Sequence, residues 1–296
     1  MTKSDKNTLS GLVVAQSMRR QTVRLIKDSP VAHSINTLIK YKINAVLCSD
    51  QAGIPIGVLS KTDIMGAYYA GLPIDSPLED IMSKPPLFCN PEDSLEKALQ
   101  LMRSKGVYRL YVRDRENSQV IGVLAYPDIV GLLYRYCHDC KYSHFRQKDQ
   151  STAVTVKRIF VKEIMTKDVQ AVFKDDTMLQ AVEMLSAYRF GAILVKDRED
   201  KPCGVISKTD LILAYKHGLD LEIPAESIMS SPVQSCNENE LLEDAIKKMI
   251  FSDMHRLFVH QSKPDEIVGV FSLSDAARIR SGSCHACVSS RISLDT

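Results

Sequence analysis

The sequence predicts an α+β fold built from four small repeats, and two spacings predict it. The segment GVLSKTD at residues 57–63 recurs as GVISKTD at 204–210, an offset of 147 residues. Within each half, a second spacing of 65 residues separates Gly57 from Gly122 and Gly204 from Gly269. Recurrence at a fixed period is the signature of a repeat architecture. We therefore interpret the chain as a duplicated pair of repeats.

The second repeat shows the order of elements. Asp93 or Ser94 can cap a helix that Gly106 ends, and its apolar residues fall at helical spacing: Leu95, Ala98, Leu99 and Met102. The elements that follow are a strand over 109–112, a polar turn over 114–118, a strand over 120–124 and a helix that starts near Pro127 and runs to 136. The predicted order is helix, strand, strand, helix.

The third repeat has the same pattern. It predicts a helix over 176–188, a strand over 192–196, a turn over 197–202, a strand over 204–207 and a helix to 217 that Gly218 ends. A sheet this small cannot bury its own apolar face, so two repeats must pack together.

The predicted organisation is therefore two paired modules. Module one covers 8–140 with repeats 10–73 and 77–137, a linker covers 141–156, module two covers 157–287 with repeats 158–220 and 224–284, and a tail covers 288–296.

Composition and charge exclude several classes of protein. Lys and Arg number 38 against 36 Asp and Glu, which leaves a net charge of +2 and no field that would hold nucleic acid or a membrane surface. Residues 1–7 are polar, unlike a signal peptide, so we expect a cytoplasmic protein. Glycine-rich phosphate loops, nucleophile elbows and histidine–carboxylate groupings at recognisable spacing are missing, and we do not expect an enzyme.

Four in-register motifs carry a family resemblance. They are GVLSKTD at 57, GVLAYPD at 122, GVISKTD at 204 and GVFSLSD at 269, and the repeat openings IMS at 81–83, IMT at 164–166 and IMS at 228–230 accompany them. The pattern resembles the cystathionine β-synthase (CBS) domain family from about residue 11 to 284. The first repeat departs at its opening, where QSMRR at 16–20 replaces the usual Ile-Met-Thr.

The motif has two interpretations. Ser60 and Asp63 are spaced like a capping box, in which both side chains satisfy free N–H groups at a helix start. The same helix start could instead bind a phosphate, with the serine hydroxyl as a further donor and the aspartate accepting from ribose hydroxyls.

The family resemblance implies the second role. The resemblance implies that the ribose ligands are Asp63, Asp210 and Asp275. It implies that the phosphate ligands are Ser60, Ser207 and Ser272, with Lys61 and Lys208 adding positive charge nearby. In repeat two Asp128 remains, but Ala125 replaces the serine, so we expect this site to be empty or altered.

Strand starts supply a second group of candidates. His255-Arg256 and Tyr108-Arg109 look like the His-Arg-Leu segment of the γ-subunit family of AMP-activated kinase, which implies that Arg109 and Arg256 reach nucleotide phosphate and makes His255 a further nucleotide-binding candidate. The planar fork of the two arginines suits that phosphate contact. Alternatively, these arginines are ordinary exposed residues. Repeats one and three carry small residues instead, Asn44-Ala45 and Gly191-Ala192, which could let adenine approach Ala45, Gly191 and Ala192.

Two Cys-x-x-Cys pairs lie outside the general family pattern. Cys137 with Cys140, and Cys284 with Cys287, could together hold zinc or an iron–sulfur centre. They could also form a reversible dithiol switch, or be reduced cysteines copied by duplication. The other four cysteines look like small apolar residues: Cys48, Cys89, Cys203 and Cys236.

The preferred hypothesis is a regulatory protein that binds an adenosyl ligand, such as AMP, ADP, ATP or S-adenosylmethionine, in clefts between paired repeats. With no effector domain attached, it would signal to a protein partner, and a homodimer is one expected assembly. The alternative is a metal- or redox-responsive regulator that uses the Cys137/Cys140 and Cys284/Cys287 pairs, with the repeats as scaffold.

Overall fold

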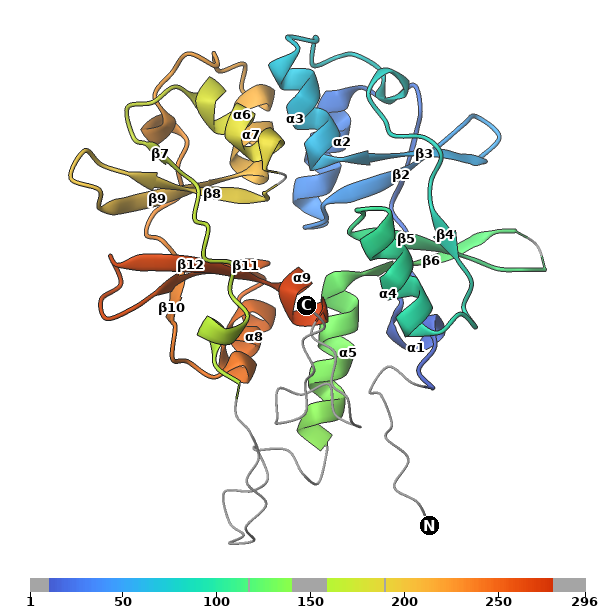
Figure 1. Ribbon diagram of the computed structural model, residues 1–296. Coiled ribbons are helices and arrows are strands. Elements are labelled where there is room, and N and C mark those ends of the chain that lie inside the picture. Colours follow the sequence, from blue (N-terminus) through green and yellow to red (C-terminus); the bar gives the residue numbers. More distant parts are fainter. Residues whose placement is uncertain (1–10, 117, 140–158, 189, 279–296) are drawn as a thin grey trace, which may run out of the picture. The chain divides into compact units, whose positions relative to one another are not determined.

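The computed structural model describes residues 11–116, 118–139, 159–188 and 190–278, and in these ranges it contains four three-stranded sheets (Figure 1). Repeat one has β1 (Arg24–Ile26), α2 (Val31–Lys40), β2 (Ala45–Ser49), β3 (Pro55–Ser60) and α3 (Lys61–Tyr69). Repeat two has β4 (Phe88–Cys89), α4 (Leu95–Ser104), β5 (Arg109–Arg113), β6 (Val120–Ala125) and α5 (Tyr126–Asp139).

The second half repeats this order. Repeat three has β7 (Ala171–Phe173), α6 (Met178–Ala187), β8 (Ala192–Lys196), β9 (Pro202–Ser207) and α7 (Lys208–Lys216). Repeat four has β10 (Ser235–Asn237), α8 (Leu242–Phe251), β11 (Arg256–His260), β12 (Ile267–Ser272) and α9 (Leu273–Arg278). A short helix α1 (Val14–Ser17) precedes repeat one. The predicted α+β fold of four small repeats is confirmed.

Each sheet contains one strand that the predicted order lacked. A strand of two or three residues precedes the first helix and pairs in parallel with the first strand of the hairpin, as Leu25 does with Cys48. The hairpin itself is antiparallel, with Val46 opposite Leu59 in repeat one. A strand this short is too brief to display an alternation of apolar and polar residues, so periodicity does not reveal it.

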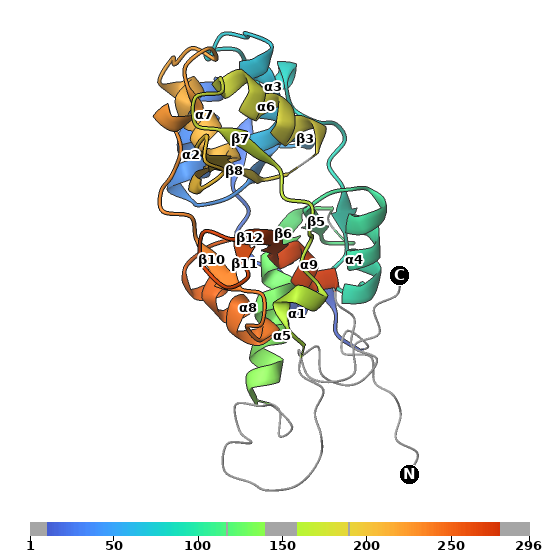
Figure 2. The same cartoon turned by 60° about the vertical axis from the view of Figure 1, so that its left-hand side comes forward.

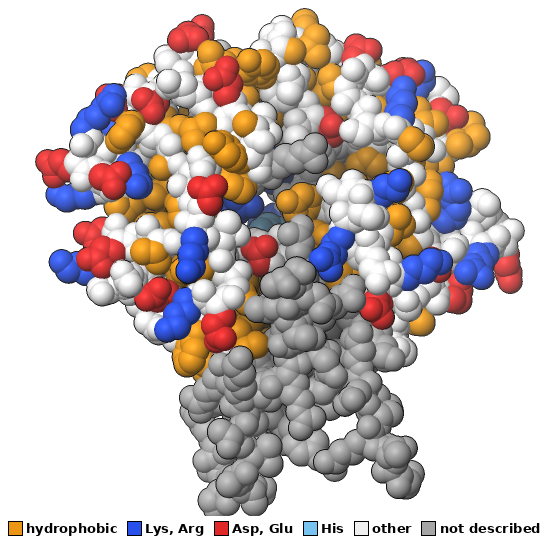
Figure 3. Space-filling view, in the orientation of Figure 1, with side chains coloured by type: hydrophobic (Ala, Val, Ile, Leu, Met, Phe, Trp, Pro, Cys, Tyr) orange, Lys and Arg blue, Asp and Glu red, His pale blue; other side chains and the backbone are white. Residues whose placement is uncertain are grey.

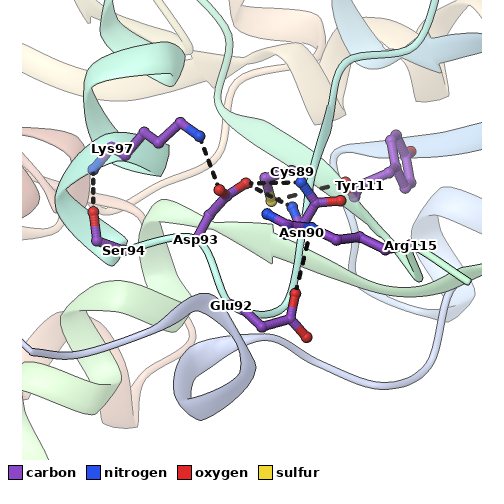
Figure 4. Close-up of polar contacts among 8 residues, drawn as sticks. All are labelled: Cys89, Asn90, Glu92, Asp93, Ser94, Lys97, Tyr111 and Arg115. Atoms are coloured by element: carbon purple, nitrogen blue, oxygen red, sulfur yellow. Dashed lines mark hydrogen bonds and ion pairs between the residues drawn. The ribbon is translucent and has the colours of Figure 1, made fainter.

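Side-chain caps set the starts of helices α3, α4, α6 and α7. Ser94, one of the two predicted caps, is the N-cap of α4, and its hydroxyl accepts from the Lys97 N–H at 3.2 Å (Figure 4). Asp93 instead accepts from the Asn90 N–H at 2.8 Å and from the Lys97 ammonium at 2.9 Å. Asp93 therefore ties the loop before the helix, while Ser94 caps the helix.

The described chain divides into two compact units, one built on the odd repeats and one on the even repeats. Of the described residues, those within 22–86 and 168–234 form one unit, and those within 11–21, 87–139, 159–167 and 235–278 form the other. In the odd-repeat unit α3 packs against α7, where the rings of Tyr68 and Tyr215 stack at 4.8 Å between centroids. In the even-repeat unit α5 packs against α9 (Figures 1 and 2).

Each unit has its own apolar core. Fully buried side chains of the odd-repeat unit include Ile35, Leu59 and Ile206, and those of the even-repeat unit include Leu99, Leu110 and Phe271. Burying one such side chain contributes about 1.5–3 kcal/mol relative to leaving it exposed. These cores hold the hairpins and the helices that follow them in fixed register.

The repeat openings are exchanged between successive repeats. Ser83, in the opening of repeat two, forms a bridge with Val58 of repeat one, and Arg19, in the opening of repeat one, forms a bridge with Val123 of repeat two. The second half repeats the exchange with two further bridges: Ser230 with Val205, and Thr166 with Val270. Each opening thus packs on the second hairpin strand of the neighbouring repeat in the sequence.

None of the helices within the described residues is both long enough and apolar enough to cross a membrane. On the face drawn in Figure 3, basic and acidic side chains are interspersed. This mixture agrees with the near balance of charges in the sequence.

Candidate nucleotide-binding site

The repeated serine and aspartate meet at the turn from the second hairpin strand into the last helix. In repeat one Ser60 is the N-cap of α3, and Asp63 Oδ2 accepts from the Ser60 N–H at 2.7 Å and from its hydroxyl at 2.6 Å. The Asp63 N–H in turn donates to Ser60 Oγ at 3.4 Å. The capping-box interpretation is therefore realised, and it places a carboxylate at a helix N-terminus.

Repeats three and four build the same turn. Asp210 Oδ2 accepts from the Ser207 N–H at 2.7 Å and from its hydroxyl at 2.6 Å. Asp275 Oδ2 accepts from the Ser272 N–H at 2.9 Å and from its hydroxyl at 2.5 Å. In three repeats, therefore, one oxygen of the aspartate accepts from both the N–H and the hydroxyl of the capping serine.

The second carboxylate oxygen contacts the exchanged opening. Asp63 Oδ1 accepts from the Ser83 hydroxyl at 2.9 Å, and Asp210 Oδ1 accepts from the Ser230 hydroxyl at 3.1 Å. Ser83 and Ser230 were not among the predicted site residues. Each lies 20 residues after its aspartate, in the Ile-Met-Ser motif, and this constant spacing is the signal that could have found them.

Repeat two differs at both oxygens. The Ala125 N–H still donates to Asp128 Oδ2 at 2.8 Å, but residue 125 has no hydroxyl to add. Asp128 Oδ1 pairs with Arg19 Nε at 2.9 Å, and Arg19 comes from the opening of repeat one. Arg19 was also absent from the predicted site residues.

The strand-start candidates lie directly across the hairpin from the caps. In the odd repeats Ala45 is opposite Ser60 and Ala192 is opposite Ser207. In the even repeats Arg109 is opposite Ala125 and Arg256 is opposite Ser272. Each repeat thus brings its own strand-start residue to its own capping turn, which sequence spacing alone did not establish.

The residues just before these strands contact the helix starts through their backbone. The carbonyl of Gly191 accepts from the Lys208 N–H at 3.1 Å, and that of His255 accepts from the Leu273 N–H at 3.0 Å. In repeat one, the carbonyl of Asn44 accepts from the Lys61 N–H at 3.0 Å. These bonds fix the strand start against the first residue of the helix.

In the even-repeat unit, the strand-start arginines lie near the carboxylates. Burial lowers the pKa of the Arg109 guanidinium, Arg19 lowers it further, and the Tyr111 phenol and Asp128 act in the opposite direction. Burial also lowers the pKa of Arg256, which the Tyr108 phenol and Asp275 oppose. Both arginines are therefore held partly out of water, close to the carboxylate of their own repeat, rather than on the open surface.

The burial of Asp128 disfavours the charged form of its carboxyl. Burial raises the pKa of its carboxyl above the usual value, against the lowering effects of Arg19, the Ala125 N–H and Arg109. Its side chain is 10% exposed, whereas that of Arg19 is 48% exposed.

The two predicted lysines make reciprocal contacts in the odd-repeat unit. The Lys61 ammonium donates to Thr209 Oγ1 at 2.8 Å, and the Lys208 ammonium donates to Thr62 Oγ1 at 2.8 Å. Each lysine therefore reaches the first turn of the other repeat's helix. Ser60 and Ser207, the neighbouring caps, are brought close to this contact.

The cysteine hypothesis falls mostly outside the described residues. Cys140, Cys284 and Cys287 lie outside them, and Cys137 is in α5 with its side chain undescribed. Within the described ranges, no group of three or more metal-ligating side chains comes together. The remaining four are free thiols, of which Cys48, Cys89 and Cys236 are buried and Cys203 is half-buried.

The CBS domain profile matches four segments of the chain: residues 13–70, 78–135, 161–217 and 225–282. The uncharacterised protein MJ1225 of Methanocaldococcus jannaschii is 23% identical over 189 residues, which are 64% of this chain and 66% of that protein. Subunit γ-3 of 5′-AMP-activated protein kinase from Sus scrofa is 23% identical over 201 residues, 65% of this chain and 37% of that subunit.

A solved structure has a similar fold. The crystal structure of protein MJ1225, described as a candidate archaeal homologue of the kinase γ subunit, superposes with a TM-score of 0.74 at 15% identity, over 90% of this chain and 99% of that chain. The matched segments cover more than half of the sequence and coincide with the four repeats. The chain belongs to the CBS domain family and contains four CBS domains.

Proposed function

We propose that this protein is a regulatory, non-catalytic sensor of adenine nucleotides. The observation that carries the proposal is the repeated turn, in which a serine-capped helix start holds a carboxylate opposite a strand-start alanine or arginine. Similarity to a subunit of a kinase activated by 5′-AMP supports an adenosyl ligand. The candidates are AMP, ADP, ATP and S-adenosylmethionine.

The carboxylates would bind the ribose. Ribose offers two adjacent hydroxyl donors, and an ionised aspartate has two oxygens that accept only. At Asp63 these oxygens currently accept from the hydroxyls of Ser60 and Ser83. A hydroxyl can rotate, so both serines can turn to the ligand as it displaces them, and every hydrogen bond is replaced.

The phosphates would be bound at the helix starts and arginines. A helix N-terminus presents N–H groups and the positive end of the helix dipole, both of which favour a phosphate. Arg256 lies opposite Ser272 and within electrostatic range of Asp275, so one repeat holds a phosphate-binding cation beside a ribose-binding carboxylate. The small residues Ala45 and Ala192 would leave space for the base in the odd repeats.

Regulation requires a partner that distinguishes the bound from the free protein. A ligand shifts a conformational equilibrium only by its differential affinity for the two states. We therefore propose that nucleotide changes the affinity for an effector protein. The free thiols within the described residues suit a reducing compartment, and a cytoplasmic location is part of the proposal.

Thermal-shift titration tests the proposal. Wild-type protein is titrated with AMP, ADP, ATP and S-adenosylmethionine, and a ligand at 100 times its Kd stabilises the folded state by about 2.7 kcal/mol. We expect a saturable rise in Tm with at least one ligand. Asp210→Ala should reduce this rise in Tm. The rise is measured from the variant's own unliganded Tm, because removal of the carboxylate also weakens the helix cap.

The matched control is Glu199→Ala, since the Glu199 side chain is 74% exposed and pairs with the neighbouring Lys201 at the surface. This control removes the same charge from the same repeat and should keep the full shift. Wild-type protein that shifts with none of the four ligands would contradict the proposed function.

A further inference from the structure

The carboxylate of repeat two is held differently from those of repeats one and three. In repeats one and three, a serine hydroxyl from an exchanged opening donates to the second oxygen, as Ser83 does to Asp63. In repeat four the equivalent position is Thr166, which bridges to Val270 and also carries a hydroxyl. In repeat two that position is Arg19, and it forms an ion pair with Asp128.

Repeat two has therefore lost both hydroxyls of the site. Ala125 stands where Ser60 stands in repeat one, and Arg19 stands where Ser83 stands. These two positions come from segments that are far apart in the sequence, yet they contact the same carboxylate. The two changes have the same effect, because each removes a serine hydroxyl that a ribose hydroxyl could replace as the donor to the carboxylate.

We propose that Arg19 closes the repeat-two site to ribose, so that nucleotide binds through repeats one, three and four only. The inference rests on the proposed function. A ribose hydroxyl that replaces a serine hydroxyl exchanges one neutral donor for another at the same carboxylate. At Asp128 it would have to replace a positively charged donor, the Arg19 guanidinium, and the ion pair would be lost.

The burial of Asp128 strengthens this argument. Its side chain is 10% exposed, so the carboxylate depends on Arg19 for compensation of its charge. The Arg19 side chain is 48% exposed, so only the carboxylate end of the ion pair is buried, and removal of Arg19 would leave that buried carboxylate without its salt-bridge partner. A neutral ribose cannot supply that compensation, and Arg109, the other nearby cation, already acts on the same carboxylate.

Binding stoichiometry tests the inference. Isothermal titration with AMP, ADP and ATP compares wild type with Asp63→Asn, Asp210→Asn and Asp128→Asn, which keep the size of the side chain. We expect Asp63→Asn and Asp210→Asn to lose a binding equivalent or weaken binding at least tenfold. Asp128→Asn should leave the affinity and the stoichiometry unchanged within twofold.

A gain of binding is the sharper test. Arg19→Ser together with Ala125→Ser restores both hydroxyls at repeat two and should add one equivalent of nucleotide. Arg20→Ser with Ala125→Ser is the matched control, because Arg20 is the exposed neighbour of Arg19. Should the Arg19→Ser double variant unfold, Arg19→Gln with Ala125→Ser keeps a neutral N–H donor for Asp128.

The outcomes separate the two proposals. Absence of nucleotide binding by the wild type contradicts the proposed function, and the inference falls with it. Binding by the wild type that weakens in Asp128→Asn overturns the inference and leaves the function standing. Folded Arg19 variants that bind no more nucleotide than the Arg20 control also overturn it.

Discussion

Met82 packs against Gly57, and a side chain at Gly57 would not fit beside it. A Cβ atom built on Gly57 would lie 2.5 Å from Met82 Sδ and 3.1 Å from the Ser83 carbonyl oxygen. The other three repeats have the same contact: Gly122 with Met18 and Arg19, Gly204 with Met229, and Gly269 with Met165. The glycine that begins each strand-to-helix motif thus packs against the methionine of a repeat opening.

Gly57→Ala should therefore destabilise the protein. Overpacking of a filled site typically costs about 1–3 kcal/mol, because Met82 and the backbone of Ser83 must both move. Gly66→Ala is the matched control, since Gly66 lies in α3 with nothing within 4 Å of an added Cβ. This second change should stabilise the helix by about 0.5–1 kcal/mol.

Urea unfolding of both variants and the wild type measures these free energies. A Gly57→Ala variant as stable as Gly66→Ala would show that the opening does not pack on the strand as described. It would also weaken the account of Ser83 beside Asp63, because Ser83 follows Met82 in the same segment.

The sequence was sufficient to predict the hairpin strands and the helices of a repeat, but not the short first strand of each sheet or the contacts between distant segments. The strand over 192–196 and the N-cap Ser94 were predicted correctly, because hydrophobic spacing and capping chemistry are local. The exchange of openings was missed, since nothing in Ile81-Met82-Ser83 indicates which strand it joins. Arg19 was missed for the same reason: its partner, Asp128, is more than a hundred residues away in the sequence.

The buried cysteines should resist alkylation in the folded protein. Burial raises the pKa of the Cys48, Cys89 and Cys236 thiols to about 12. At pH 8 only about one thiol in ten thousand would then be ionised, and the thiolate is the reactive form. Native labelling with iodoacetamide, followed by peptide mass spectrometry, should leave these three unmodified.

Cys203 provides the internal comparison, because it is half-buried. It should be labelled first among the four cysteines whose side chains are described. Labelling of Cys48 at the rate of Cys203 would mean that the sheet of repeat one opens readily under native conditions.

The loop before α4 should be stabilised by Asp93 in a pH-dependent way. Burial opposes ionisation of this carboxyl, but the Asn90 N–H and the Lys97 ammonium outweigh it and hold its pKa below the usual value (Figure 4). A lowered pKa gives stability that is present above the unfolded pKa of about 3.9 and is lost as the pH falls through the folded pKa.

Asp93→Asn should therefore cost about 1 kcal/mol at pH 7, and the difference from wild type should shrink below pH 4. Denaturant unfolding between pH 3 and pH 7 measures it. Glu92→Gln is the control, since Glu92 is 67% exposed and should have little effect at any pH. A cost for Asp93→Asn that stays constant down to pH 3 would assign the effect to packing rather than charge.

The reciprocal contacts Lys61–Thr209 and Lys208–Thr62 should contribute equally to the stability of the odd-repeat unit. Both are ammonium-to-hydroxyl bonds of 2.8 Å between the first turns of α3 and α7. Each bond carries a charged donor at a partly solvated position, so a coupling free energy of about 0.5–1.5 kcal/mol is expected.

Two double-mutant cycles with Lys→Ala and Thr→Val replacements isolate these couplings from the other contacts of each side chain. Equal couplings would establish that the two odd repeats meet symmetrically at the helix starts beside Ser60 and Ser207. A coupling near zero for one pair and not the other would contradict this symmetric contact.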